Sequence, residues 1–170
     1  MGIFELLKWI WEQFEHYIWP WTIIHSYERG IRLTWGKNPK LVEPGLRFKF
    51  PFSQTILSEN VMPNTMCPKA IHITTTDGKT VSVEPAIEYQ VVDLISWVIN
   101  VNDAFSNLND ITRGVVSDYL TDLTWDEVKN KRTQTEIKKR LNKRCEDMGC
   151  KITNVMLTDI CLTRVIITQI

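Results

Sequence analysis

The chain has 170 residues, enough for one hydrophobic core of ordinary size and few for two. It carries 20 Lys and Arg against 20 Asp and Glu, and this balance excludes the strong overall field that draws a protein to nucleic acid or to a highly anionic substrate. Its four cysteines have no Cys-x-x-Cys spacing and no histidine close by in the sequence, which predicts reduced thiols without a zinc site, a redox motif or a bound cofactor.

Residues 3–19 are predicted to form an amphipathic helix that Pro20 ends. A membrane-spanning helix needs about 20 mostly apolar residues, and each central charge costs about 2.5 to 3.5 kcal/mol while each Leu, Ile or Phe returns only about 0.3 to 0.6. Because Lys8, Glu12 and Glu15 outweigh that gain, we expect an interfacial helix. The alternative is a helix that caps the domain or packs on a partner protein. The membrane-contacting side chains are predicted to be Ile3, Phe4, Leu7, Ile10, Trp11, Phe14, Ile18, Trp19 and Trp21.

Short strands are predicted to follow the helix. Residues 22–27 are an entry strand, and residues 27–52 alternate as strand, turn and strand, with Asn38-Pro39 in the turn region. Further strands are expected at 55–60, 70–75 and 80–92, where Asp77-Gly78 is a strong hairpin signal. Pro85 indicates that the strand at 80–92 is an edge strand or a bulged one.

The hydrophobic period changes to that of helices after Asp93. We expect a short helix at 94–100, a helix from Asp103 as its N-cap to Leu123, and a long helix that the capping box at 124–127 opens and Gly149 stops. A last strand is predicted at 150–160. The pattern is that of an α+β fold in which helices pack on a small, mostly antiparallel sheet.

Several short segments, in a shared order over residues 23–165, resemble a known family. They are Glu28-Arg29-Gly30-Ile31, Gly36-Lys37 and the segments 44–52, 75–83, 87–91, 148–152 and 159–162. Together they are similar to the SPFH, or Band 7, domain of stomatins, prohibitins and flotillins. The resemblance implies an SPFH domain at 22–170 preceded by a membrane-associated helix at 1–21. Such domains usually continue into a long helix with heptads, whereas this sequence ends at Ile170. We therefore expect either a tailless member or a short assembly element that begins after Arg164.

The resemblance also implies a function. We expect a non-enzymatic, membrane-associated scaffold that self-assembles into a ring, cage or array and organises or encloses membrane proteins. Its expected partners are membrane lipids, other copies or other SPFH proteins, and a membrane protease or channel. The protein is expected to be a peripheral or monotopic membrane protein at the cytoplasmic face. The alternative is a soluble adaptor or inhibitor that binds a partner protein through the Trp-rich helix.

A basic segment is the main charge feature, with eight Lys or Arg and one acid between Lys129 and Arg144. It is either a solvated helix face or a contact with anionic lipid headgroups or with an acidic face of a neighbouring subunit; nucleic acid is excluded because no aromatic residues are interleaved. The predicted contact residues are Lys129, Arg132, Lys138, Lys139, Arg140, Lys143 and Arg144.

No catalytic or metal site is predicted. The three histidines, His16, His25 and His72, lie in separate segments without i, i+4 partners. The sequence contains none of the Gly-x-Ser-x-Gly, phosphate-loop, dinucleotide-binding or His-Glu-x-x-His motifs.

Overall fold

The computed structural model describes residues 2, 4, 5, 8 and 20–162, and the chain divides into two compact units, 1–62 and 63–170. Most of the helix predicted at 3–19 lies outside the described residues; within it, Phe4, Glu5 and Lys8 are helical.

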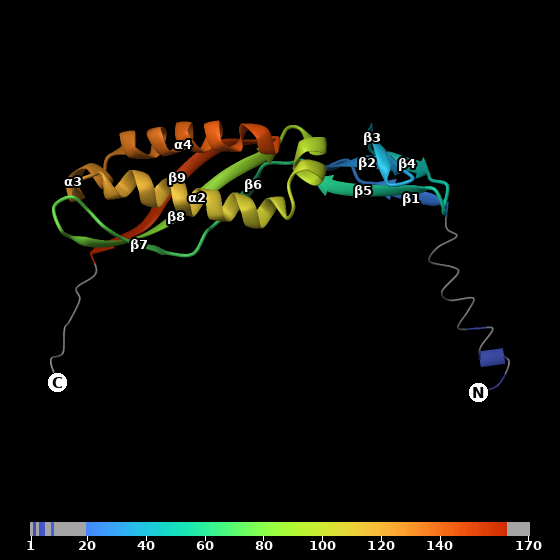
Figure 1. The fold of residues 1–170 in the computed structure, drawn as a ribbon, viewed down its shortest axis with the longest axis horizontal. Coiled ribbons are helices and arrows are strands. Elements are labelled where there is room, and N and C mark those ends of the chain that lie inside the picture. The colour runs from blue at the N-terminus through green and yellow to red at the C-terminus, as the bar shows by residue number, and fades with distance from the viewer. Residues whose placement is uncertain (1, 3, 6–7, 9–19, 163–170) are drawn as a thin grey trace. The chain divides into compact units, whose positions relative to one another are not determined.

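The described part of the first unit contains five short strands (Figure 1). The strand β2 (Glu28–Thr34) lies between β3 (Lys37–Val42) and β5 (Gln54–Asn60), and β1 (Trp21–Ile24) pairs with β4 (Gly45–Phe48), all antiparallel. The small core of this unit contains Ile24 and Ile31, both almost fully buried.

One predicted loop in the first unit is a strand. The residues around Asn38-Pro39 form β3, which makes a hairpin with β2 through a turn at Trp35 and Gly36, both with positive φ. Pro39 is tolerated there because β3 is an edge strand, where one missing N–H leaves no partner unsatisfied. The predicted strand after Gly45 is confirmed as β4, but its partner is β1 and it ends at Phe48.

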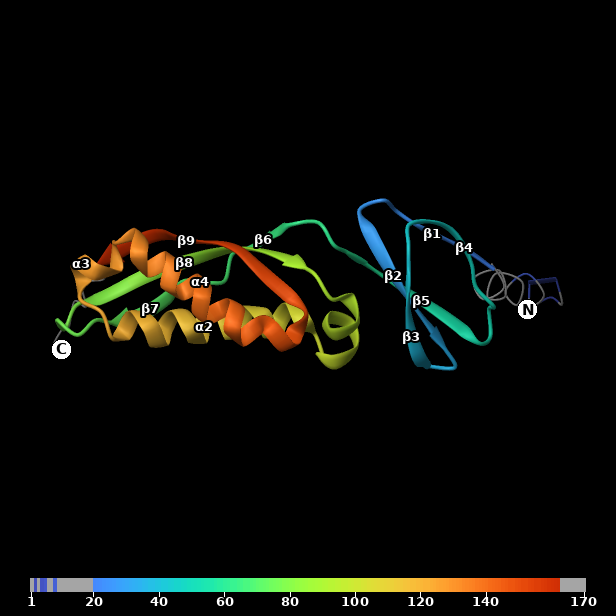
Figure 2. The ribbon, with the colours of Figure 1, turned by 90° about the horizontal axis from the view of Figure 1, so that it is seen from above.

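The second unit is one antiparallel sheet with helices on a single face (Figures 1 and 2). The central strand is β8 (Thr80–Val91), which pairs with β9 (Cys150–Leu162) on one side and with β6 (Asn64–Met66) and β7 (Ile71–Thr74) on the other. The helices α2 (Ala104–Thr121) and α4 (Lys131–Cys145) cover the sheet. Short helical turns occur at η1 (Ser96–Asn100), α3 (Trp125–Val128) and η2 (Glu146–Met148). The apolar residues predicted on one face of β8 are all buried: Val81, Val83, Ile87, Tyr89 and Val91.

Pro85 lies in a central strand, so the edge-strand alternative is wrong, and the bulge alternative is confirmed by a register shift between Ser82 and Glu84. On the other side of β8, β7 pairs as far as Val83 and β6 begins at Ile87. Pro85 therefore lies where the sheet has a gap, and such a gap can accommodate a residue without an N–H.

The predicted helix caps are confirmed, but the long helix predicted from the capping box is two helices. Asp103 Oδ1 accepts a hydrogen bond from Ser106 N at 3.1 Å, and the capping box of Thr124 with Glu127 is formed. The helix α3 nevertheless ends at Val128, because Asn130 starts α4 as a new N-cap: its Oδ1 accepts from Arg132 N at 3.1 Å. Gly149, with φ 75°, terminates the last turn as predicted.

Candidate membrane-binding and subunit-contact surfaces

Only two of the predicted membrane-contacting side chains lie in the described part of the chain. Phe4 is 88% exposed and Trp21, in β1, is half-exposed. The other seven lie outside the described residues: Ile3, Leu7, Ile10, Trp11, Phe14, Ile18 and Trp19. None of the helices formed by the described residues is long and apolar enough to cross a membrane.

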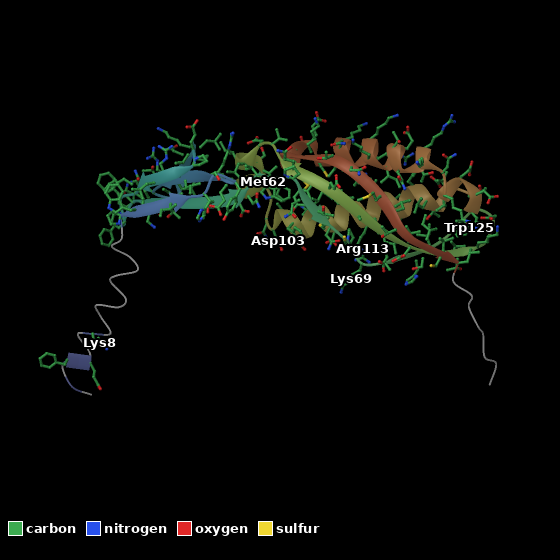
Figure 3. All side chains as sticks on the ribbon, turned by 180° about the vertical axis from the view of Figure 1, so that it is seen from behind. Lys8, Met62, Lys69, Asp103, Arg113 and Trp125 are labelled. Carbon is green, nitrogen blue, oxygen red and sulfur yellow. The ribbon has the colours of Figure 1, made fainter. Side chains whose placement is uncertain are left out.

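The first unit exposes a group of aromatic side chains that we call the aromatic rim. Trp21 and Phe48 meet edge to face with ring centroids 5.3 Å apart, and Phe48 meets Phe50 in the same way at 5.1 Å. Trp35 and Phe52 are more open still, with 75% and 78% of their surfaces exposed. Figure 3 shows ring side chains gathered at one end of this unit. An exposed apolar group of this size is typical of a surface that binds a membrane or another protein.

Two open hollows, of about 600 and 660 Å³, border the aromatic rim. The first is lined in part by Trp35, Phe52 and Lys49. The second is lined in part by Trp21, Arg32 and Arg47, and Arg47 Nε is held by a hydrogen bond of 3.0 Å to the Glu43 carbonyl oxygen. Each hollow therefore combines a ring with a cation, the pairing that suits the polar and apolar layers of a membrane interface.

Of the aromatic rim, only Trp21 was among the residues predicted to touch a membrane. In the sequence, the spacing of Phe48, Phe50 and Phe52 is that of one side of an extended segment, although in the structure β4 ends at Phe48 and residues 51–53 form a turn. This signal is visible in the sequence, but a one-sided apolar strand usually packs in a core. In the described part of the chain all three are instead exposed, which only the structure shows.

The basic segment forms the exposed side of α4 and the turn before it. Its buried side consists of Thr133, Ile137, Leu141 and Cys145, spaced every fourth residue. Seven of its eight basic side chains are exposed, and Lys138 is half-buried.

The basic side chains of this segment are largely uncompensated. Lys139 Nζ pairs with Glu136 Oε1 at 2.7 Å, which is the one ion pair of α4 among the described residues. Lys129 lies 4.1 Å above the Trp125 ring, and Arg140 lies 4.4 Å above the Tyr119 ring of α2. Arg132, Lys143 and Arg144 have no carboxylate partner in the described part of the chain, so the segment keeps a strong positive potential.

Comparison with known proteins identifies the family. The sequence profile described as SPFH domain / Band 7 family matches residues 22–170. The chain belongs to the SPFH/Band 7 family. It is 30% identical to Modulator of FtsH protease HflK of Escherichia coli (strain K12) over 139 residues, which are 78% of this chain and 33% of HflK. It is 25% identical to Stomatin-1 of Caenorhabditis elegans over 141 residues, 81% of this chain and 43% of that protein. It is 32% identical to Modulator of FtsH protease HflC of Escherichia coli (strain K12) over 84 residues, 45% of this chain and 25% of HflC.

The family match confirms the α+β SPFH fold expected from the sequence, with antiparallel sheets and packed helices. The chain of this SPFH protein spans less than half the length of each of these three relatives.

The perturbed ionisable groups of this SPFH domain have structural causes. The hydrogen bond from Lys79, then that from the Thr75 hydroxyl, lowers the pKa of Asp77 to about 2. This carboxylate fixes the turn between β7 and β8 and also accepts a hydrogen bond from Trp125 N.

A hydrogen bond to Cys150, together with burial, raises the pKa of the Cys145 thiol, so this thiol stays protonated and is a poor nucleophile. No cluster of three or more potential metal ligands occurs among the described residues.

Proposed function

We propose that this SPFH protein is a non-enzymatic, membrane-associated scaffold that self-assembles at the bilayer into a ring, cage or array. Segment 1–21 and the aromatic rim form its attachment surface, and residues 22–170 form the SPFH domain. The observation that carries the proposal is the exposed aromatic rim, because it directly follows the predicted amphipathic helix: Trp21 is the first residue of β1 and already contacts Phe48. Together the helix and the aromatic rim would insert aromatic rings at headgroup depth from two adjacent segments.

The proposed partners are membrane lipids, further copies or other SPFH proteins, and a membrane protease or channel that the assembly organises or encloses. Two relatives support the protease, since HflK and HflC are both named modulators of the FtsH protease. The proposed location is peripheral or monotopic at the cytoplasmic face. All four cysteines are free, which fits a reducing compartment.

Flotation on liposomes tests the attachment. The full chain and a version that begins at Trp21 would be mixed with phosphatidylcholine liposomes and centrifuged through a density gradient. We expect most of the full chain to float and the shortened chain to float weakly through the aromatic rim alone. Far-ultraviolet circular dichroism would verify that both versions are folded.

If neither version floats, the membrane proposal is wrong. The exposed Trp-rich surface would then favour the alternative, a soluble adaptor or inhibitor that binds a partner protein.

A further inference from the structure

Charge is unevenly divided within the second unit. Residues 129–144 contain eight basic side chains and one acid, a net charge of +7. The rest of the described part of this unit, residues 63–128 and 145–162, contains four basic and thirteen acidic side chains, a net charge of −9. A neutral overall composition therefore conceals a strongly polarised domain.

The two helices of the second unit lie on the same face of its sheet, but over opposite edges. The helix α4 packs on β9, and α2 packs on β7. Because β8 pairs with β9 along one of its edges and with β7 along the other, these two strands lie at opposite edges of the sheet. Figures 1 and 2 show the corresponding arrangement, with α2 and α4 side by side on one face. The basic segment thus follows one side of the domain, and α2 follows the other.

The exposed face of α2 is acidic. Its buried side consists of Ala104, Leu108, Thr112, Val116 and Leu120, which repeat every fourth residue. Asp103, Asp110, Asp118 and Asp122 are exposed at or next to this helix, against one basic residue, Arg113. None of these four aspartates forms an ion pair within the described structure. We call this surface the acidic face.

The basic side chains of α4 form a line opposite its buried residues. Arg132, Lys139 and Lys143 are spaced i, i+7 and i+11, so they share one helix face. The contact between α4 and α2 of the same copy, Arg140 over Tyr119, uses a ring rather than a carboxylate. The positive line of α4 and the acidic face of α2 are therefore both available to other molecules.

We propose that the basic line of α4 docks on the acidic face of α2 in a second copy of this chain. The contact joins two different surfaces, so it repeats from copy to copy and closes into a ring or extends as a row. This inference rests on the proposed self-assembly and identifies the interface that would produce it.

A second copy explains more of the charge pattern than anionic lipid does. Anionic headgroups would attract α4, but they would repel the acidic face, which carries four exposed aspartates. A neighbouring copy matches both surfaces at once, and such complementarity gives specificity and a fixed register.

Charge exchange on the full chain tests this interface. Variant one carries Lys139→Glu and Lys143→Glu, and variant two carries Asp110→Lys and Asp118→Lys. Self-association is measured by energy transfer between labelled copies on liposomes. The liposomes are made of phosphatidylcholine, because its headgroups have no net charge. We expect each variant alone to need about tenfold or more higher protein concentration for half-maximal association, because like charges meet. An equimolar mixture of the two is expected to recover association, because every contact then joins opposite charges.

A matched control carries Lys37→Glu and Lys40→Glu, which makes the same charge change at two exposed sites of β3. It is expected to associate like the wild type. Thermal unfolding of each variant reports whether the fold is kept.

The outcomes separate the two proposals. If the wild type floats but its copies stay isolated, the proposed self-assembly fails and this inference fails with it. If the wild type associates and the mixture of variants does not recover, or neither variant is impaired, only the α4-to-α2 interface is wrong. If variant one differs from the wild type only on phosphatidylserine liposomes, α4 contacts lipid and the inference is overturned.

Discussion

Phe52→Glu is expected to lower the partition coefficient of the protein onto liposomes about 10- to 100-fold. Full burial of a Phe side chain in an apolar environment contributes about 1.5 to 3 kcal/mol, and each 1.4 kcal/mol corresponds to about tenfold in a partition coefficient. Phe52 is 78% exposed in the structure, so the substitution removes little packing within the protein, and the fold is expected to remain intact. The measurement is a liposome titration followed by sedimentation.

The matched control for this prediction is Phe105→Glu. Phe105 is also exposed, at 52%, but it lies on α2 in the second unit and not on the aromatic rim. The same change in size and charge there is expected to leave the partition coefficient within about a factor of two of the wild type, since an exposed side chain away from the contact contributes little. Equal losses in the two variants would show that the aromatic rim has no special role in membrane binding.

Gly149→Ala is expected to destabilise the second unit by about 3 kcal/mol or more. Gly149 has φ 75°, and an L-residue in the left-handed region costs about 1 to 2 kcal/mol. A Cβ at this position would also meet the Asp93 carbonyl oxygen at 2.3 Å. That backbone cannot easily move away, because Val92 N and Asp93 N both donate to the Gly149 carbonyl oxygen at 2.9 Å. Urea unfolding monitored by circular dichroism would measure the loss.

Gly114→Ala gives the opposite expectation with the same substitution. Gly114 lies inside α2, and a Cβ there would have no neighbour within 4 Å. Alanine is a better helix former than glycine by about 0.8 to 1 kcal/mol, so a small gain in stability is expected. If Gly149→Ala unfolds at the same urea concentration as Gly114→Ala, the proposed packing around Gly149 is wrong.

Local signals predicted much of the second unit, because its turns and caps depend on single residues. Asp77-Gly78 placed the hairpin of β7 and β8 correctly, with Gly78 at φ 75°. Asp103 placed the start of α2, and Gly149 placed the end of the last helical turn. Each of these residues either supplies a hydrogen bond or accepts a backbone conformation that few other residues adopt.

Two features were not predicted because neither is decided by a single residue. Pro39 is a strand breaker in isolation, and only the position of β3 at the edge of its sheet makes it acceptable. The helix break at Asn130 is a competition between one continuous helix and a second cap, and the Thr133 hydroxyl supports the break by donating to the Glu127 carbonyl oxygen at 2.7 Å.

Of the candidate surfaces, one was predicted from the sequence and two were found only in the structure. The charge of the basic segment was visible in the sequence, since charge needs no partner to be recognised. The exposure of the aromatic rim and of the acidic face of α2 was not visible, because it depends on which residues the fold leaves uncovered.

Electron microscopy of the full chain bound to liposomes tests the central claim most directly. The account predicts continuous rings or ordered rows of copies on the bilayer surface, whose spacing is constant and which disappear in the Lys139→Glu, Lys143→Glu variant. Protein that covers the liposomes as isolated, randomly placed copies at every concentration would contradict the claim that this SPFH protein is a self-assembling membrane scaffold.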